Sequence, residues 1–272
     1  REGHAVVVAR DGVQALAAGG YRAVAMDMRG YGGSSRPLDS SEYSFDKLSG
    51  DVLAVLDHFG YEQAVLIGHD FGANLAWHMG IYYPDRIRAI APLCVPYDME
   101  LAGGSDELPS QLFATIARQH FFHMHYYQAV GVAERHCRGR EREFLTKLFW
   151  ALSAEGELLN WENFPMAGTH YIDVLAEPPQ ALPWSWLSVA DMDYYVEQYL
   201  RAGPERAFIG GANSYRVMDR NWQLQRANAR LAAEKRYLEE EIRTERRTDE
   251  IVGGGAAMKH VMEQVGGVAP TD

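Results

Sequence analysis

The sequence contains very little cysteine, no long apolar run and no excess of positive charge. Only two of its 272 residues are cysteine, Cys94 and Cys137, and they form no spaced cluster. A disulfide framework or a zinc site is therefore not expected. Two buried or idle thiols in a reducing compartment are expected instead. No stretch approaches the roughly 18 apolar residues that a membrane span needs, and no basic-then-apolar leader pattern opens the sequence. These absences predict a soluble, cytoplasmic protein without membrane contact.

Positive charge is scarce as well. The sequence has 26 Lys and Arg against 37 Asp and Glu, which gives a formal net charge of -11 at pH 7. Proteins that bind nucleic acid through their surface need a basic patch, so a nucleic-acid partner is not expected. The phosphate-binding motif GxxxxGK[ST] is absent too, and ATP binding is therefore not expected. We expect no cofactor and no bound metal.

The first third of the sequence alternates between strand and helix patterns. Short connections join these segments, and strands alternating with helices predict a parallel sheet covered by helices. Glycines in "RGYGGSSRP" mark a loop after the first of these strands, at the edge where sites form in open α/β sheets. The predicted strands are 21–28, 64–67 and 87–95, and the predicted helices are 13–18, 45–59 and 72–83.

The amino-acid composition changes at two further points along the sequence. From about Pro96 the segments are helical and rich in aromatic residues, and from about residue 223 charges crowd a long helical pattern. Leucine recurs there at every seventh position, which favours a solvated or coiled-coil helix over 223–247 and self-association through it. A glycine break and one short helix follow. The expected domains are a partial core at 1–96, a helical cap at 97–225 and a charged C-terminal segment at 226–272, and the leucines are Leu224, Leu231 and Leu238.

One acidic residue stands between two glycines where an apolar run stops, in "VLIGHDFGANLAW". A strand that bends sharply into a helix through Gly-x-nucleophile-x-Gly presents the central side chain above the sheet. We expect both glycines, Gly68 and Gly72, to be needed because larger residues would collide at the bend. A carboxylate at Asp70 would attack a saturated carbon and form an ester that water must later cleave. The alternative is that Asp70 only caps the helix, as aspartates commonly do.

Four separated segments carry a family resemblance. They are "GYRAVAMDMRGYGGSSRP" (20–37), "VLIGHDFGANLAWHMGIYYPDRIRAIAPLCVPY" (65–97), "YYQAVGVAE" (126–134) and "LPWSWLSVADMDYYVEQYLRAGPERAFIGGANSYRVMDRNWQL" (182–224). Over about 13–225 the chain resembles the epoxide hydrolases of the α/β-hydrolase family. The resemblance implies an incomplete α/β-hydrolase-like parallel sheet with a helical cap. It also implies that Asp70 opens an epoxide to an alkyl-enzyme ester and then a diol, with the N–H of Phe71 in the oxyanion hole.

The same resemblance implies that cap residues donate a proton to the epoxide oxygen. Tyr215 in "NSYRVMDRNW" matches the family's second lid tyrosine, and His123 occupies the position of the first. A packed cap histidine is the alternative for His123, with Tyr126 and Tyr127 as fallback donors. Tyr127 and Trp184 are expected to line the pocket of a small apolar epoxide, although core packing explains aromatic cap residues equally well. Haloalkane dehalogenation shares the Asp bend but relies on an indole N–H where this sequence has Phe71.

Some parts of the family pattern are not found. No acid followed by a "GHW"-like turn appears after residue 225, and His260 lies in a helical pattern. Asp98 and Glu100 follow a strand where some relatives carry the acid, and the "HGxP" loop is missing. Because no base would activate water, the resemblance predicts an ester that is not turned over.

The two ends resemble other proteins. "REGHAVVVARDGVQALAAG" is similar to the middle of a response-regulator receiver domain. Residues 228–272 resemble the linker helix and first turn of the AAA+ domain in bacterial enhancer-binding activators. Two alternatives to the enzyme therefore stand: a regulatory or interaction module that dimerises through 223–247, and a chimeric fragment, truncated as a hydrolase at both ends, without activity.

Overall fold

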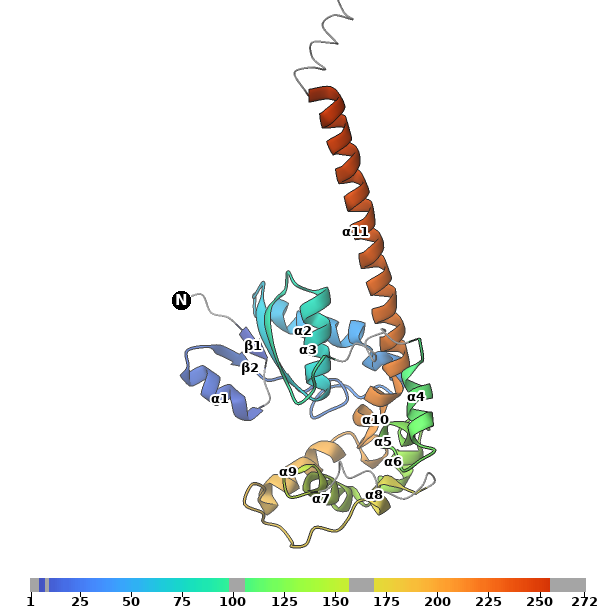
Figure 1. The fold of residues 1–272 in the computed structure, drawn as a ribbon. Coiled ribbons are helices and arrows are strands. Elements are labelled where there is room, and N and C mark those ends of the chain that lie inside the picture. Colours follow the sequence, from blue (N-terminus) through green and yellow to red (C-terminus); the bar gives the residue numbers. More distant parts are fainter. Residues whose placement is uncertain (1–4, 8–9, 98–105, 157–168, 255–272) are drawn as a thin grey trace, which may run out of the picture. The chain divides into compact units, whose positions relative to one another are not determined.

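The structure, a computed structural model, describes residues 5–7, 10–97, 106–156 and 169–254. The chain divides into two compact units, residues 1–223 and 224–272. Among the described helices, none combines the length and the apolar character required to cross a bilayer. The elements, labelled in Figure 1, are β1 (Ala5–Val7), α1 (Arg10–Ala18), β2 (Arg22–Val24), η1 (Ser40–Tyr43), α2 (Phe45–His58), β3 (Ala64–His69), α3 (Phe71–Tyr82), β4 (Ile87–Leu93), α4 (Pro109–Ile116), α5 (His123–Tyr126), α6 (Val132–Cys137), α7 (Glu141–Leu152), α8 (Tyr171–Val174), α9 (Val189–Leu200), η4 (Pro204–Arg206), α10 (Ile209–Arg216) and α11 (Met218–Gly254).

The described strands form a parallel sheet in the order β2-β1-β3-β4. The predicted α/β class is therefore confirmed, but two details differ from the prediction. The sequence analysis did not assign β1, which lies between β2 and β3. The strand predicted at 21–28 is shortened to Arg22–Val24. Among the described strands β2 lies at the edge of the sheet, and its described neighbour there, β1, offers three residues to pair with.

The sheet contains a point at which the direction of the chain connections reverses. From β1 the chain moves outward to β2 in one direction, and from β3 it moves to β4 in the other. Right-handed crossovers then place α1 on one face and α2 and α3 on the opposite face. Figure 1 shows α2 and α3 adjacent to each other, away from α1. Ligands bind at such a reversal in open α/β sheets, and Asp70 directly follows β3 at this position.

The local sequence explains why α2 forms and where it ends. Its buried residues Leu48, Val52 and Leu56 recur at every fourth position and make one apolar stripe. After the helix, Gly60 adopts a φ of 73°, a conformation that glycine accepts without strain. Its N–H donates to the Asp57 carbonyl (3.0 Å), and the following N–H donates to the Leu56 carbonyl (3.0 Å). This glycine-ended cap satisfies carbonyls that the last turn leaves free, so the helix stops cleanly before β3.

A first group of buried side chains, called here the core cluster, joins the sheet to α2 and α3. All its members are aliphatic or methionine, and each fully buried leucine among them contributes about 2 kcal/mol. This cluster fixes β3 against α3 and so fixes the bend between them. Its residues are Leu48, Val52, Leu56, Ala64, Leu66, Leu75, Ala76, Met79 and Ile87.

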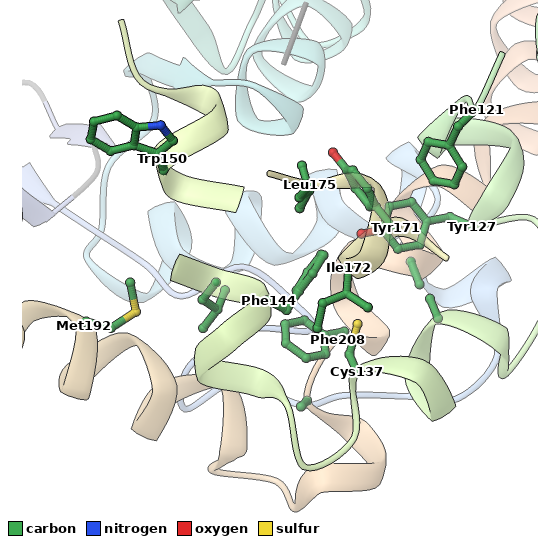
Figure 2. Close-up of a cluster of buried hydrophobic side chains, with 14 of the residues drawn as sticks. Phe121, Tyr127, Cys137, Phe144, Trp150, Tyr171, Ile172, Leu175, Met192 and Phe208 are labelled. Atoms are coloured by element: carbon green, nitrogen blue, oxygen red, sulfur yellow. The ribbon is translucent and has the colours of Figure 1, made fainter. Parts of the chain in front are cut away.

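A second group, called here the cap cluster, lies among helices α5 to α10 and is dominated by aromatic rings. Figure 2 shows Tyr127, Tyr171 and Phe121 gathered at one side of this cluster, with Trp150 and Met192 at the other. The boundary predicted at residues 96–97 stays a prediction, and it is supported by two separate clusters on either side of it. The cap cluster comprises Phe121, Tyr127, Ala133, Cys137, Phe144, Leu145, Trp150, Tyr171, Ile172, Leu175, Trp184, Leu187, Met192, Ala207, Phe208 and Ala212.

The long charged helix is present as α11. It begins at Met218, before the predicted start at 223, and continues to Gly254, beyond the predicted end at 247. Several sequence predictions fall outside the described residues. These concern Asp98, Glu100, His260 and the short helix expected near the C-terminus.

Candidate active site

The bend from β3 to α3 depends on one glycine more than on the other. A Cβ atom added at Gly68 would lie 2.0 Å from the Gly72 carbonyl oxygen and 2.7 Å from the Ala73 nitrogen, so no side chain fits there. A Cβ atom added at Gly72 would meet no described atom within 4 Å. The expectation that collision explains both glycines is therefore wrong for Gly72. An added Cβ at Gly72 would point away from every other described segment, whereas one at Gly68 would collide with the backbone of the first helical turn.

Asp70 itself occupies a strained backbone conformation at the bend. Its φ is 55° and its ψ is -120°, a combination that costs a residue with a side chain about 1–3 kcal/mol. The Asp70 carbonyl accepts from the N–H groups of Ala73 (2.9 Å) and Asn74 (3.2 Å), but the carboxylate makes no capping hydrogen bond. The helix-cap alternative is thus not supported. Asp70 is exposed, and no described side chain donates a hydrogen bond to it.

Phe71 joins the bend to the cap. It is the first residue of α3, so its N–H has no acceptor within the helix and lies at the positive end of the helix dipole. An oxyanion that formed next to Asp70 would find a donor of this kind there. The ring of Phe71 packs edge to face on Tyr215, with 4.9 Å between the ring centroids.

The cap residues selected from the sequence lie together around Tyr215. The ring of Tyr127 stacks on Tyr215 at 5.0 Å with an interplanar angle of 5°. The imidazole of His123 meets the same ring edge to face at 5.4 Å. The structure therefore gathers Phe71, His123, Tyr127 and Tyr215 at one place, next to Asp70.

Burial decides the protonation states of these groups. Burial, and after it the negative charge of Asp70, raises the pKa of the Tyr215 phenol well above its usual value. Tyr215 therefore carries its proton at neutral pH and lies within electrostatic reach of Asp70. Burial lowers the pKa of His123 to about 4. At pH 7 this imidazole is neutral and has a single N–H to donate.

An ion pair next to Tyr215 links this residue to Tyr127. The Arg216 guanidinium donates to both carboxylate oxygens of Glu134 (2.6 and 3.1 Å) and to the backbone carbonyl of Tyr127 (2.8 Å). Burial alone would raise the pKa of Glu134, but the hydrogen bonds and charge of Arg216 outweigh it and lower that pKa. Glu134 is therefore ionised at neutral pH. Because Arg216 follows Tyr215 directly, this pair ties Tyr215 to the backbone of Tyr127.

Two other sequence candidates lie elsewhere in the cap. Trp184 packs against Trp150 (5.1 Å) and Trp186 (5.0 Å), and its indole N–H donates to the Gln180 carbonyl (3.1 Å). Among described ring contacts none joins Trp184 to Tyr215, and its pocket role stays a prediction. Tyr126, a fallback donor like Tyr127, packs edge to face on Tyr127 (5.5 Å between the ring centroids), and its hydroxyl lies 3.0 Å from Nδ1 of His136.

The structure adds three tyrosines that the sequence analysis missed. Tyr31, in the glycine loop after β2, has its pKa raised by burial and then by Tyr199 and Asp70, so it lies within electrostatic reach of the nucleophile candidate. Tyr171 stacks on His123 (5.8 Å) and meets Tyr127 edge to face (6.0 Å). The "GYGG" loop could have pointed to Tyr31. No local motif marks Tyr171 or Tyr199.

A cavity of about 240 Å³ lies apart from Asp70 and Tyr215 in the cap. Its lining is mostly apolar. Among the residues that the structure describes, no group of three or more His, Cys, Asp or Glu side chains is arranged to hold a metal ion. The lining residues are Ala117, Phe121, Phe122, His125, Tyr126, Ala129, Val132, His136, Thr169 and His170.

Comparison with known proteins identifies the family. Residues 3–124 match the alpha/beta hydrolase fold family. The crystal structure of epoxide hydrolase A from Mycobacterium thermoresistibile aligns with a TM-score of 0.72 and 35% identity, over 82% of this chain and 70% of that chain. The chain belongs to the epoxide hydrolase family of α/β-hydrolases. An epoxide hydrolase from an endophytic Streptomyces gives a TM-score of 0.71 at 31% identity, over 83% and 69% of the two chains.

Curated epoxide hydrolases agree with this membership but are longer than the aligned region. Epoxide hydrolase A of Mycobacterium tuberculosis is 35% identical over 215 residues, which are 79% of this chain and 64% of that protein. Bifunctional epoxide hydrolase 2 of Sus scrofa is 34% identical over 212 residues, which are 78% of this chain and 36% of that protein. The family match begins at residue 3, before the start near residue 13 that the sequence analysis expected, and it includes β1.

Proposed function

We propose that this chain opens a small apolar epoxide by attack of Asp70, with Tyr215 as the principal proton donor. The observation that carries the proposal is the carboxylate of Asp70, exposed on a strained bend and within electrostatic reach of a half-buried, protonated phenol. His123, through its neutral N–H, serves as second donor, and the N–H of Phe71 serves as the oxyanion donor. Relatives named epoxide hydrolase support the choice of substrate.

The first half-reaction is a displacement at carbon. A carboxylate oxygen of Asp70 bonds to a ring carbon of the epoxide, and the carbon–oxygen bond of the ring breaks. The electron pair goes to the epoxide oxygen, which takes the proton of the Tyr215 hydroxyl. The products are a hydroxyalkyl ester on Asp70 and a phenolate at Tyr215.

The electrostatics of the site couple the two events. The negative charge of Asp70 helps to keep the pKa of Tyr215 high before the reaction. As the ester forms, that charge passes to the epoxide oxygen, which becomes a stronger base than a phenolate as the ring bond breaks. The proton is therefore released most readily when the leaving oxygen needs it.

Intact mass spectrometry with styrene oxide tests this half-reaction. We expect one adduct on the wild-type chain, mapped by peptide sequencing to Asp70 and lost in Asp70→Asn. Asp85→Asn, at another exposed aspartate, is the matched control and should keep the adduct. Failure of the wild-type chain to form an adduct at any pH between 5 and 9 would remove the proposal.

The second half-reaction, hydrolysis of the ester, requires a base that activates water. After residue 225 this sequence has no acidic residue that is followed by a "GHW"-like turn. We therefore expect the 272-residue chain to accumulate the ester instead of releasing diol at catalytic rates. Sustained diol formation, followed by chromatography, would show that a base is supplied from a residue we have not assigned.

A second candidate function is self-association through α11. Large apolar side chains stand exposed along this helix, including Leu231 (62%), Tyr237 (65%), Leu238 (48%) and Ile242 (51%). Leu231, Leu238 and Ile242, spaced by seven and four residues, share one face of the helix, and burying this stripe against another helix is favourable. This function does not exclude the chemistry at Asp70, and a separate experiment described below tests it.

A further inference from the structure

Two glycines far apart in the sequence touch backbone to backbone next to the candidate site. Gly30 lies in the loop after β2, and Gly210 lies in the first turn of α10. A Cβ atom added at Gly210 would lie 2.5 Å from the Gly30 carbonyl oxygen and 2.8 Å from its Cα. A Cβ atom added at Gly30 would lie 2.5 Å from the Gly210 Cα. Neither position can accept a side chain without separating the two segments.

Polar contacts on both sides hold the same two segments together. The buried guanidinium of Arg36 donates to the carbonyls of Gln198 (2.5 Å) and Tyr199 (2.5 Å). Those carbonyls belong to the last turn of α9 and receive no hydrogen bond from N–H groups of the helix itself. The positive charge of Arg36 therefore also lies at the negative end of the α9 dipole. Asn213 of α10 donates to the Leu38 carbonyl (3.2 Å).

These contacts bear on Tyr215 because Tyr215 belongs to α10, the helix that begins at the glycine contact. The same short helix therefore touches the core loop through Gly210 and packs on Phe71 through Tyr215 (4.9 Å). Phe71 is adjacent to Asp70 in the chain. A displacement of α10 away from the loop would carry Tyr215 away from the nucleophile candidate.

We propose that the Gly30–Gly210 contact, with Arg36 beside it, sets the distance between the Tyr215 hydroxyl and the Asp70 carboxylate. Gly30, Gly210 and Arg36 act as positioning residues. The inference rests on the function proposed above, because it assigns a role in the reaction to that distance. A misplacement of about 1 Å between reacting groups can lower a rate on the order of 10²-fold.

Neighbouring glycines provide a matched test. Gly210→Ala adds a methyl group against the Gly30 backbone, whereas Gly211→Ala adds one 3.4 Å from the Tyr31 hydroxyl, an ordinary contact distance. Both substitutions change the helix propensity of α10 in the same direction, so a difference between them reports the contact. We expect Gly210→Ala to lower the maximal rate of styrene oxide labelling by about 10- to 100-fold. The half-saturating epoxide concentration should change much less, and Gly211→Ala should stay within threefold of wild type.

A structural readout separates this inference from the proposed function. The Phe71–Tyr215 ring contact should give a through-space NMR signal in protein labelled at phenylalanine and tyrosine, assigned by its loss in Tyr215→Phe. We expect the signal in wild type and Gly211→Ala and its loss in Gly210→Ala. If wild type forms no adduct, the proposed function fails and this signal alone decides the positioning claim.

Two results would overturn the inference. One is a Gly210→Ala protein that keeps the ring contact. The other is a labelling rate for Gly210→Ala equal to that of Gly211→Ala. If Gly210→Ala does not fold, Arg36→Lys replaces it, since lysine keeps the charge but cannot reach both α9 carbonyls. Arg36→Lys should weaken the ring contact and slow labelling, and an unchanged signal and rate would contradict the inference.

Discussion

The core cluster and the cap cluster both bury apolar surface, but they differ in the kind of side chain that supplies it. The core cluster is made of aliphatic side chains and one methionine and contains no titratable group. The cap cluster contains phenols such as Tyr127 and Tyr171 and packs against Tyr215. Aliphatic packing holds the backbone of the bend at a strained φ, and aromatic packing holds proton donors in a dry environment.

The two parts hold their candidate residues by different means. Asp70 is held by backbone geometry and is exposed, so its carboxylate remains free to react. Tyr215 is held by side-chain packing and is half-buried, so its phenol keeps its proton. Substitutions inside either cluster should therefore lower stability, whereas loss of the Tyr215 hydroxyl should lower the rate.

Cavity formation should give the largest loss of stability. Leu66→Ala in the core cluster and Leu145→Ala in the cap cluster remove the same atoms from buried sites (5% and 0% exposed). We expect each to lower the free energy of unfolding by about 2–5 kcal/mol, measured by urea denaturation. Both should unfold in one transition, because residues 1–223 form one compact unit. Leu38→Ala, at an exposed leucine, is the control, and two separate transitions would show that core and cap unfold independently.

Removal of one partner of the buried ion pair should be nearly as costly. Glu134→Gln leaves the Arg216 charge buried without its counter-charge. We expect a loss of about 3 kcal/mol in the free energy of unfolding. Glu62→Gln on the surface should have little effect. Equal stability of the two variants would mean that the pair does not stabilise the cap.

Loss of the Tyr215 hydroxyl should act on the rate and spare the fold. Tyr215→Phe keeps the ring contacts with Phe71 and Tyr127 but removes the proton. We expect the rate of adduct formation to fall about 10²-fold, with an unchanged melting temperature. Tyr195→Phe, at a half-exposed tyrosine, is the matched control. An unchanged rate in Tyr215→Phe would assign the proton to another donor, with His123 tested next.

Acid should destabilise the fold through two histidines, one in each part: His78, which is buried, and His123, which is half-buried. Burial lowers the pKa of His78, in α3, and that of His123 to about 4. Between the unfolded pKa near 6.5 and the folded value, the unfolded chain binds more protons, so stability falls as pH falls through this window. At pH 5 each histidine should cost about 2 kcal/mol relative to pH 7. In His78→Leu the unfolding free energy should fall less steeply with falling pH than in wild type. An equal slope in the two proteins would contradict the assignment to His78.

The smallest effect concerns α11 and should leave labelling at Asp70 intact. Leu231→Glu with Leu238→Glu places charges on its exposed leucine stripe. We expect sedimentation velocity to show weaker self-association of the full chain than for wild type. Ala229→Glu with Ala233→Glu adds the same two charges away from that stripe and serves as control. An unchanged association state in the double variant would remove these leucines as a contact surface.

Sequence alone was sufficient for the elements with strong local patterns. The apolar stripe of α2, the strand from Ala64 and the bend at Asp70 were all predictable, because each depends on neighbours in the chain. β1 was not assigned, because a three-residue strand carries little pattern and gains stability only from pairing on both sides. The resemblance of the two chain ends to regulator fragments stays a prediction.

The sequence by itself determined the α/β class, the family and an acid at a strand-to-helix bend, since these depend on periodicity and short motifs. Only the tertiary structure decided which phenols reach that acid. Only the "GYGG" loop pointed to Tyr31, and no local motif marks Tyr171 or Tyr199. Tyr31 meets Tyr199 from a segment more than a hundred residues away, and Tyr171 meets His123 from a separate helix. The same holds for Gly30 and Gly210, whose requirement for glycine is created by a contact that exists only after the cap has folded onto the core.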